Sequence, residues 1–251
     1  MGEADGAGSI TAALVVIGDE VLSGRTKDKN IGHIAERLTD VGIDLREVRI
    51  VPDVEEDIVA AVNALRQRFT YVFTTGGIGP THDDITADSI AAAFGVSIDV
   101  DPRARAMLLE YIAEKDLNEA RLRMARIPAG ASLVVNEVSK APGFRIGNVI
   151  VMAGVPRIMQ SMLEAVLPEL DKGRPMLSRT ILADAREGDI AAPLGEIARA
   201  FPEAVIGSYP FRDETDGRFK TNLVVRSREP AVLDAAGDAV ARMVEAAAGP
   251  G

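Results

Sequence analysis

Short apolar runs alternate with helical apolar spacings along the first two thirds of the chain. The runs are rich in valine, isoleucine, phenylalanine and threonine, which is typical of strands buried in a sheet. Strands are predicted at Ala12–Ile17, Ile43–Val51, Tyr71–Thr75, Ser132–Val135 and Asn148–Met152. Apolar residues three or four positions apart predict helices at Asn30–Val41, Val54–Phe69, Thr86 to beyond Phe94, Pro102–Lys115, Leu117–Ile127 and Arg157–Val166.

This alternation is typical of an α/β fold, a three-layer αβα domain with a mostly parallel sheet, and it covers residues 10–172. The segment Pro168–Pro175 mixes proline, glycine and charge, which indicates a domain boundary. The elements predicted beyond it are Met176–Ala183, Ile190–Phe201, Ala204–Tyr209, Phe219–Ser227 and a helix from Pro230 to Ala247. We therefore expect a small C-terminal α+β domain over residues 173–251 and a flexible N-terminal tail over residues 1–9.

The loop after the third predicted strand carries three glycines, Gly76, Gly77 and Gly79. Glycine allows the backbone to take positive φ and allows a ligand to touch it. Thr86 is the predicted N-cap of the next helix, and the free N–H groups at a helix start favour anions. Asp83 and Asp84 lie in the same loop and would repel a phosphate unless a cation lay between them. The loop thus indicates a site for phosphate together with Mg²⁺.

Two better-known phosphate-binding motifs are excluded in this loop. The dinucleotide fingerprint needs glycine or alanine at its sixth position, where this chain has His82. The P-loop ends in Gly-Lys-Ser/Thr, and the loop contains no lysine. A plain glycine turn with acidic helix-capping residues is the alternative interpretation of the loop by itself.

Polar residues follow other predicted strands in the same way, namely Gly18, Asp19 and Glu20, then Asp53, and then Gly154. Because ligands bind where the carboxyl ends of parallel strands meet, we expect these loops to converge with the glycine loop. Ordinary local roles are the alternative. Asp53 and Glu56 have the spacing of a capping box, Asn30 has the position of a helix cap, and Asp19 and Glu20 suit a turn.

Residues 76–86 read Gly-Gly-Ile-Gly-Pro-Thr-His-Asp-Asp-Ile-Thr. This segment resembles the signature of the molybdopterin-binding (MoaB/Mog-like) domain, and more closely its version in the competence/damage-inducible protein A (CinA) family. Further matches at Gly18-Asp19-Glu20, Asn30, Pro142-Gly143-Phe144 and Gly154-Val155-Pro156 extend the resemblance over about two thirds of the chain. Members of that family often continue into a C-terminal nicotinamide-nucleotide amidase domain, which we expect this chain to lack.

The resemblance implies a divalent-metal-dependent pyrophosphatase that acts on nucleotides such as ADP-ribose. A related domain of FAD synthases is credited with FAD hydrolysis. Catalytic roles are implied for Asp53, Asp83 and Asp84, and Asp53 and Asp84 are expected to hold the cation, which is Mg²⁺ or else Mn²⁺ or Co²⁺. The ligand- and phosphate-binding residues implied are Gly18, Asp19, Glu20, Asn30, Thr75, Gly76, Gly77, Gly79, Pro80, Thr81, Pro142, Gly143, Gly154 and Pro156.

Two other functions are compatible with the same loop. Mog-like proteins bind and adenylylate molybdopterin during molybdenum cofactor biosynthesis, which needs a similar acidic metal site and glycine cradle. A nucleotide-binding or scaffold protein without turnover is the third possibility. The chain has Ala153-Gly154-Val155-Pro156 and Val138-Ser139-Lys140-Ala141 where the family usually has Pro-Gly-Val-Pro and Gly-Thr-Ala. These departures leave the substrate open between a nucleotide and a pterin.

The composition limits which kinds of partner and which cellular compartment are expected. The formal net charge of −10 opposes nucleic-acid binding, and the local basic cluster of Arg121, Arg123 and Arg126 is interpreted as a solvated helix face. No apolar run approaches the ~20 residues of a membrane span, and Met1–Ser9 is not a signal peptide. With no cysteine in the chain, we expect a cytoplasmic protein. The resemblance suggests a homo-oligomer, a dimer or a trimer.

Overall fold

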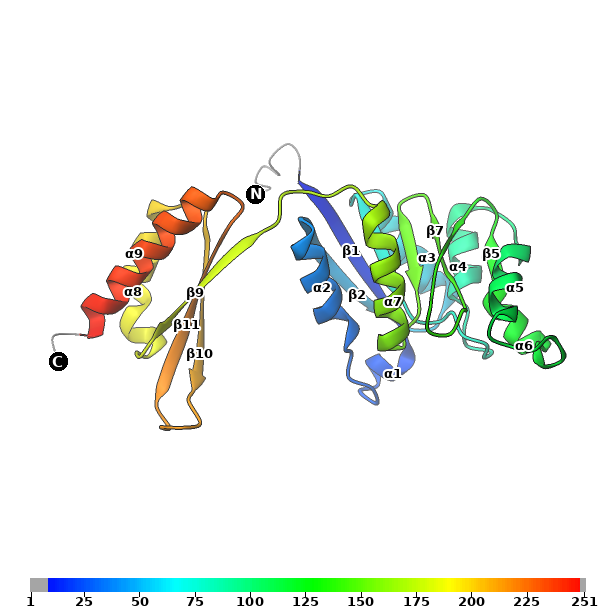
Figure 1. The fold of residues 1–251 in the computed structure, drawn as a ribbon, viewed down its shortest axis with the longest axis horizontal. Coiled ribbons are helices and arrows are strands. Elements are labelled where there is room, and N and C mark those ends of the chain that lie inside the picture. Colours follow the sequence, from blue (N-terminus) through cyan, green and yellow to red (C-terminus); the bar gives the residue numbers. More distant parts are fainter. Residues whose placement is uncertain (1–8, 249–251) are drawn as a thin grey trace. The chain divides into compact units, whose positions relative to one another are not determined.

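The computed structural model describes residues 9–248 and divides the chain into two compact units, Met1–Gly173 and Arg174–Gly251 (Figure 1). The tail predicted over residues 1–9 lies almost wholly outside the described residues. No helix within residues 9–248 combines the length and the apolar character needed to cross a membrane.

The first unit is built on one six-stranded sheet in the order β2-β1-β3-β8-β7-β6. Its strands are β1 (Ile10–Ile17), β2 (Ile43–Val51), β3 (Tyr71–Thr75), β6 (Ser132–Val134), β7 (Gly143–Ile146) and β8 (Val149–Met152). Strand β1 pairs in parallel with β2 and β3, and β3 pairs in parallel with β8. Strands β7 and β6 complete the sheet in antiparallel pairing. The prediction of a mostly parallel sheet is confirmed.

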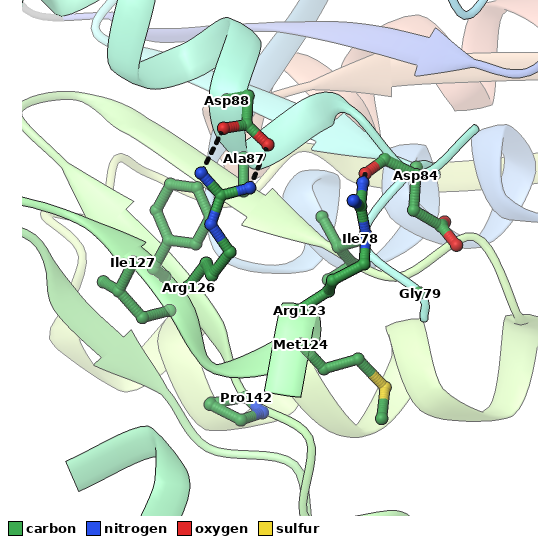
Figure 2. Close-up of a pocket in the computed structure, with 12 residues that line it drawn as sticks. Ile78, Gly79, Asp84, Ala87, Asp88, Arg123, Met124, Arg126, Ile127 and Pro142 are labelled. Carbon is green, nitrogen blue, oxygen red and sulfur yellow. Dashed lines mark hydrogen bonds and ion pairs between the residues drawn. The ribbon is translucent and has the colours of Figure 1, made fainter. Parts of the chain in front are cut away.

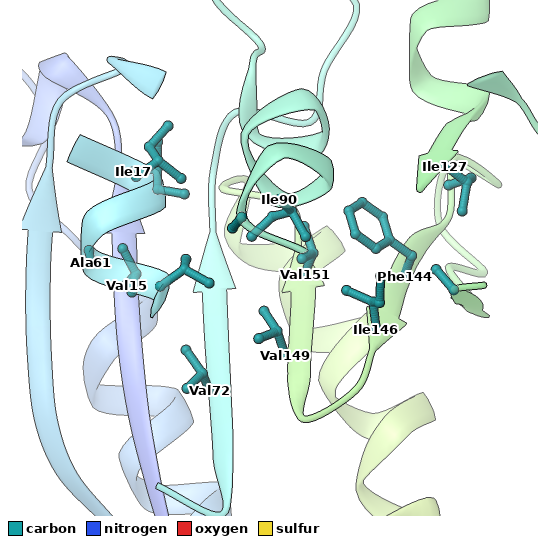
Figure 3. Packing of buried hydrophobic residues seen from close by; sticks show 14 of the residues in the cluster. Val15, Ile17, Ala61, Val72, Ile90, Ile127, Phe144, Ile146, Val149 and Val151 are labelled. Atoms are coloured by element: carbon teal, nitrogen blue, oxygen red, sulfur yellow. The ribbon is translucent and has the colours of Figure 1, made fainter. Parts of the chain in front are cut away.

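Helices cover both faces of this sheet (Figure 1). They are α2 (Asn30–Asp40), α3 (Glu55–Arg66), α4 (Thr86–Phe94) and α7 (Pro156–Val166), the last followed by the 3₁₀ turn η3 (Leu167–Glu169). Val15 and Ile17 pack on the side of α3 and α4 (Figure 3), whereas Leu14 and Val16 pack on the side of α2 and α7. Because β1 is covered on both faces, its last six residues are all buried, which explains their continuous apolar run.

The segment predicted as one helix over Leu117–Ile127 forms several shorter elements instead. They are α6 (Glu119–Leu122), the 3₁₀ turn η2 (Arg123–Ala125) and β5 (Arg126–Pro128), which pairs antiparallel with β4 (Ile98–Val100). Distant contacts override the local helical propensity, because Ile127 is buried in the core and Arg126 forms an ion pair with Asp88 of α4. The helix predicted to reach Lys115 also ends early, as α5 (Pro102–Leu109), ahead of the 3₁₀ turn η1 (Glu114–Asp116).

The sequence patterns also missed β4, α1 (Asp19–Leu22) and β7. The short helix α1 follows β1 directly, and β7 lies between the predicted strands Ser132–Val135 and Asn148–Met152. Strand β7 runs very close to β8, since a Cβ atom on Gly143 would lie 2.3 Å from the carbonyl oxygen of Val151. Glycine at this position therefore serves strand packing.

The second unit is a small α+β structure, as predicted. Its elements are β9 (Leu177–Ala183), α8 (Glu187–Ala200), β10 (Val205–Arg212), β11 (Phe219–Ser227) and α9 (Pro230–Ala248). The three strands form an antiparallel sheet in the order β10-β11-β9. Leu223 and Val225 of β11 pack against Ile190 of α8 and against Ala236 and Val240 of α9. The unit thus has its own apolar core.

An ion pair stabilises the hairpin between β10 and β11. The Lys220 Nζ atom lies 2.5 Å from Asp213 Oδ2 and 3.0 Å from Asp216 Oδ2. The ammonium of Lys220 and the hydroxyl of Thr215 hold the pKa of Asp213 well below its ordinary value of 3.8. In turn, the carboxylates of Asp213 and Asp216 raise the pKa of Lys220 to about 12. The pair is therefore charged over a wide pH range.

These shifts predict a pH-dependent hairpin. Because the pKa of Asp213 is depressed on folding, its stabilising effect is present above pH 3.8 and is lost as the pH falls below that value. We expect the Gly217 amide, which donates to the Asp213 carbonyl, to lose hydrogen-exchange protection between pH 7 and about pH 2.5. Asp213→Asn should show weaker protection at pH 7 and little further change on acidification. Glu214→Gln in the same loop is the control, and an Asp213→Asn variant with the pH profile of the unmodified chain would contradict the prediction.

Candidate functional site

The carboxyl ends of β1, β2, β3 and β8 lie at one edge of the parallel sheet, and the loops that follow them enclose a cavity of about 490 Å³. This cavity is lined by Ile17, Gly18, Glu20, Thr26, Asp53, Gly76, Gly77, Gly79, Asp83, Asp84, Gly154, Val155 and Pro156. Four separate loops therefore contribute to one site. A cavity at this edge is the arrangement that favours ligand binding in open α/β sheets.

The glycine loop after β3 packs directly on the end of β1. Gly76 has a φ of 102°, and a Cβ atom there would lie 2.1 Å from the carbonyl oxygen of Ile17. Gly77 has a φ of 64°, and a Cβ atom there would lie 2.2 Å from Thr86 Oγ1. Both positions combine a left-handed backbone with contacts that leave no room for a side chain. The close approach of the loop to β1 requires glycine.

Thr86 fixes this loop to the start of α4. Its hydroxyl donates to the carbonyl oxygen of Gly76 at 2.9 Å, and its N–H donates to the carbonyl oxygen of Gly77 at 2.9 Å. Thr86 is fully buried and is the first residue of the helix, while Ile85 holds the N-cap position. The prediction that Thr86 caps α4 is wrong, because its hydroxyl is used to hold the glycine loop.

Asp53 connects the loop after β2 to the start of α1. Its Oδ2 atom accepts a hydrogen bond from the Asp19 N–H at 3.0 Å. The N-cap of α3 is Val54, which makes no side-chain capping bond, so the capping-box interpretation of Asp53 is wrong. Burial raises the pKa of Asp53, the hydrogen bond from Asp19 opposes this, and the charges of Asp19, Glu20 and Asp83 raise the pKa further. A bound cation would relieve this repulsion.

Asp84 closes a tight turn inside the glycine loop. Its Oδ2 atom accepts hydrogen bonds from the Thr81 N–H at 2.7 Å and from the Thr81 hydroxyl at 2.6 Å. Asp53 follows β2 and Asp84 follows β3, and β1 lies between these two strands. The two aspartates therefore reach the same cavity from either side of β1.

The acidic residues around the larger cavity are Glu20, Asp53, Asp83 and Asp84. Within the described part of the chain, no three histidine or acidic side chains are gathered closely enough to hold a metal ion by themselves. Mg²⁺ rarely needs such a cage, because it keeps several waters and is held by one or two carboxylates together with substrate phosphates. This set of oxygen donors is compatible with a cation that binds together with a phosphorylated ligand.

A second cavity of about 210 Å³ adjoins the first and shares Ile17, Glu20, Thr26, Gly154 and Pro156 with it. Asn30 and Thr75 line this smaller cavity. The side-chain amide of Asn30 donates to the carbonyl oxygen of Gly154 at 2.8 Å. The cap of α2 is provided by Asp28, whose Oδ1 atom accepts from the N–H groups of Asn30 at 3.0 Å and Ile31 at 2.8 Å. Asn30 thus joins α2 to the loop after β8 and does not cap its own helix.

On their other side the glycine loop and α4 each bind one arginine (Figure 2). Arg126 makes a two-bond ion pair with Asp88, at 2.8 and 2.7 Å, and Arg123 donates to the carbonyl oxygen of Asp84 at 3.1 Å. These side chains line a depression of about 20 Å³ next to Gly77 and Gly79. The interpretation of the basic cluster as a solvated helix face is wrong for Arg123 and Arg126, because Arg123 binds the glycine loop and Arg126 is paired with Asp88 of α4.

The structure brings most of the predicted site residues to these cavities. Those that line one of them are Gly18, Glu20, Asn30, Asp53, Thr75, Gly76, Gly77, Gly79, Asp83, Asp84, Pro142, Gly154 and Pro156. Four predicted residues do not, namely Asp19, Pro80, Thr81 and Gly143. Asp19 and Thr81 instead hold the carboxylates of Asp53 and Asp84. The binding and catalytic roles of all these residues stay predictions.

Sequence patterns missed part of the lining. The residues that line a cavity without having been predicted include Thr26, Lys27, Asp28, Lys29, Arg123, Arg126 and Val155. Thr26 to Lys29 directly precede Asn30 in the segment between α1 and α2. This proximity to a predicted site residue is the sequence feature from which their position at the cavity could have been predicted. The two arginines reach the site through contacts with residues more than thirty positions away, which no local pattern reveals.

Two family models match the chain. The model of the probable molybdopterin binding domain matches residues 13–172, and the model of the middle domain of FAD synthase matches residues 175–248. A protein of Archaeoglobus fulgidus is 32% identical over 198 residues, which cover 78% of this chain and 84% of that protein. A protein of Pyrobaculum calidifontis is 35% identical over 217 residues, which cover 82% of this chain and 83% of the relative.

A solved structure extends the comparison. The crystal structure of CinA from Thermoplasma acidophilum, described as a protein with unknown function, superimposes with a TM-score of 0.61 and 33% identity. The match covers 64% of this chain and 98% of that one. The resemblance to the CinA family that the motifs indicated is confirmed.

The packing of the glycine loop predicts that one added methyl group strongly destabilises the folded chain. We expect Gly76→Ala to lower the free energy of unfolding by about 3–5 kcal/mol, because backbone strain at positive φ adds to a clash with the Ile17 carbonyl. Gly95→Ala is the matched control, since Gly95 also has positive φ, 65°, but nothing within 4 Å of an added Cβ. We expect Gly95→Ala to lower the free energy of unfolding by only about 1 kcal/mol, the cost of backbone strain at positive φ. Urea unfolding measures both free energies. If the two variants lost the same free energy of unfolding, the result would contradict the close approach of the loop to β1.

Proposed function

Because this chain belongs to the molybdopterin-binding domain family, with a cavity of about 490 Å³ lined by acidic residues and by its glycine loop, we propose that it is a divalent-metal-dependent nucleotide pyrophosphatase. The single observation that carries the proposal is the arrangement of Asp53 and Asp84 on either side of β1, facing a cavity lined by Gly76, Gly77 and Gly79. Carboxylates and a bound phosphate are compatible in one cavity only when a cation separates them.

In this proposal each group of residues has a separate role in pyrophosphate cleavage. Asp53 and Asp84 would hold the cation, which supplies polarisation of a phosphoryl oxygen and a more acidic bound water. The glycine loop would bind the phosphate oxygens through backbone N–H groups other than that of Gly76, which donates to the carbonyl oxygen of Met152. Thr81 orients the Asp84 carboxylate by two hydrogen bonds, and the Asp19 N–H orients that of Asp53. The carboxylates would then be held in place before the ligand arrives.

The second unit supports a dinucleotide substrate. Residues 175–248 match the middle domain of FAD synthase, an enzyme whose named product contains a pyrophosphate between two nucleosides. A substrate of the FAD or ADP-ribose type therefore agrees with both parts of the chain. In this proposal the first unit binds the pyrophosphate, since it contains the acidic cavity.

Molybdopterin binding or adenylylation is the second candidate. The description of the matching family, probable molybdopterin binding domain, favours it. Both chemistries place a phosphate beside a divalent cation, so the acidic residues and the glycine loop serve either one. A ligand that is bound but not turned over would make the chain a non-catalytic nucleotide-binding protein.

The proposal predicts that two carboxylates are essential for turnover but not for folding. We expect Asp84→Asn and Asp53→Asn each to lower the hydrolysis of FAD or ADP-ribose by at least about a hundredfold, because a neutral amide holds the cation poorly. The melting temperature should change little, since the asparagine oxygen can still accept the bonds from Thr81 or Asp19. Asp99→Asn is the matched control, as Asp99 is outside the cavities and accepts a local bond from the Val100 N–H.

The measurement is product formation from FAD, ADP-ribose, NAD and coenzyme A, with EDTA and then with Mg²⁺, Mn²⁺ or Co²⁺. Hydrolysis that requires the metal and is lost in both variants would support the proposal. Hydrolysis that continues in EDTA would overturn it. Absence of hydrolysis together with tight molybdopterin binding would support the second candidate instead.

A further inference from the structure

Arg123 binds the main chain of Asp84, one of the two aspartates assigned to the cation. Its Nη2 atom donates to the carbonyl oxygen of Asp84 at 3.1 Å, and the two residues are 39 positions apart in the sequence. The carboxylate of Asp84 points away from the guanidinium (Figure 2), and Arg123 does not line the larger cavity. The arginine therefore contacts Asp84 from behind its carboxylate, where it can fix the residue without pairing with its charge.

Asp84 ends an exposed turn that begins at Thr81. Within the turn, the N–H and the hydroxyl of Thr81 donate to Asp84 Oδ2, and the Asp84 N–H donates to the Thr81 carbonyl oxygen at 3.3 Å. Among the residues that the structure describes, the bond from Arg123 is the one hydrogen bond that joins this turn to a distant segment. The internal bonds set the shape of the turn, and the bond from Arg123 sets its position.

The segment that carries Arg123 is itself firmly held. Ala125 is fully buried, and β5, which follows it, pairs with β4. Arg126 makes its two-bond ion pair with Asp88 in the first turn of α4. The segment is thus fixed to the same helix that the turn enters. A side chain on such a base can hold Asp84 at a constant position relative to α4.

Two physical effects oppose an arginine at this position. A positive charge beside a cation site weakens the binding of the cation. The Nε atom of Arg123 is also buried, and it has no hydrogen-bond partner among the described residues, which destabilises the folded chain. Against these two effects stands the bond to Asp84, which is the hydrogen bond that the guanidinium makes within residues 9–248.

We propose that Arg123 is a positioning residue for Asp84: its guanidinium holds the main chain of Asp84 and so keeps the carboxylate at the larger cavity. The role of that carboxylate as a cation ligand rests on the proposed function. The holding of Asp84 is a property of the free chain, so it can be measured without metal.

Two variants separate the bond from the charge. Arg123→Met removes the guanidinium and keeps an unbranched apolar side chain, whereas Arg123→Lys keeps the charge and an N–H donor. We expect the melting temperature of both to change little, because the buried unpaired Nε atom is absent from each.

Hydrogen exchange of the Thr81 amide, followed by NMR, reports on Asp84 in the free chain, because this N–H donates to Asp84 Oδ2 at 2.7 Å. We expect exchange to be about tenfold faster in Arg123→Met, the effect of one lost hydrogen bond. In Arg123→Lys the exchange should stay near that of the unmodified chain.

Mn²⁺ binding, followed by electron paramagnetic resonance of the free ion, is the second measurement. We expect Arg123→Met to bind Mn²⁺ about tenfold more weakly, as is typical when a group that orients a metal ligand is removed. Arg123→Lys should restore most of the affinity. The direction of the change is decisive, since the loss of a positive charge by itself would strengthen Mn²⁺ binding.

Arg121→Met is the matched control. Arg121 is exposed, and its guanidinium donates to the carbonyl oxygen of Asp116 instead of the glycine loop. This variant removes the same charge from the same part of the chain and keeps the bond to Asp84. It should leave Thr81 exchange unchanged and should not weaken Mn²⁺ binding.

Faster Thr81 exchange and weaker Mn²⁺ binding in Arg123→Met, both restored in Arg123→Lys, would support the proposal. Unchanged Thr81 exchange in Arg123→Met, or Mn²⁺ binding that is as tight as in the unmodified chain or tighter, would overturn it. Faster exchange of a core amide such as that of Val15 together with Thr81 would indicate general destabilisation and would also overturn it.

These outcomes are distinct from failure of the proposed function. If the unmodified chain binds no Mn²⁺ and hydrolyses none of the nucleotides, the proposed function falls, and Thr81 exchange in the two variants still decides whether Arg123 holds Asp84. If hydrolysis requires Asp84 but Arg123→Met changes neither Thr81 exchange nor Mn²⁺ binding, the proposed function stands and the positioning role falls.

Discussion

The contact between the backbone of Gly76 and the carbonyl oxygen of Ile17 determines how the rest of the site is built. At this point the loop after β3 lies so close to the end of β1 that a single methyl group would overlap it. Thr86 secures the contact by binding the carbonyl oxygens of Gly76 and Gly77. The Gly76 N–H also donates to the carbonyl oxygen of Met152 in β8, so the loop is held to the sheet and its carboxylates, Asp83 and Asp84, lie at the edge where the strands end. Rigid support of this kind is what positions functional side chains precisely enough to act.

Electrostatic repulsion is the second constraint on this edge of the sheet. Asp53 is partly buried near Asp19, Glu20 and Asp83, and both burial and these charges raise its pKa. Such a cluster does not stabilise the fold by itself, which supports the proposal that this edge of the sheet binds a cation. The arginines on the other side of the glycine loop do not neutralise it, since Arg126 is paired with Asp88 and Arg123 binds a backbone carbonyl.

Three polar residues show why local spacing misled the sequence interpretation. Thr86, Asp53 and Asn30 each stand where a helix cap is expected, and each makes its side-chain bond to a distant segment instead. A cap requires only neighbours within one turn, so a sequence pattern can propose it. A bond between the ends of two strands requires the folded sheet. The same reason applies to the stretch before Pro128, where pairing of β5 with β4 replaced a predicted helix.

The sequence by itself determined the layered fold, because burial on both faces of β1 and on one face of each helix imposes periodicities that can be read locally. It also indicated the glycine loop and the acids at the strand ends, since residue type limits backbone shape and charge there. Tertiary structure alone decided that β1 separates Asp53 from Asp84, that Arg123 binds the glycine loop and Arg126 pairs with α4, and that Asn30 and Thr75 border one cavity. These relations join segments far apart in the chain, and their geometry exists only after the sheet has closed and the helices have packed on it.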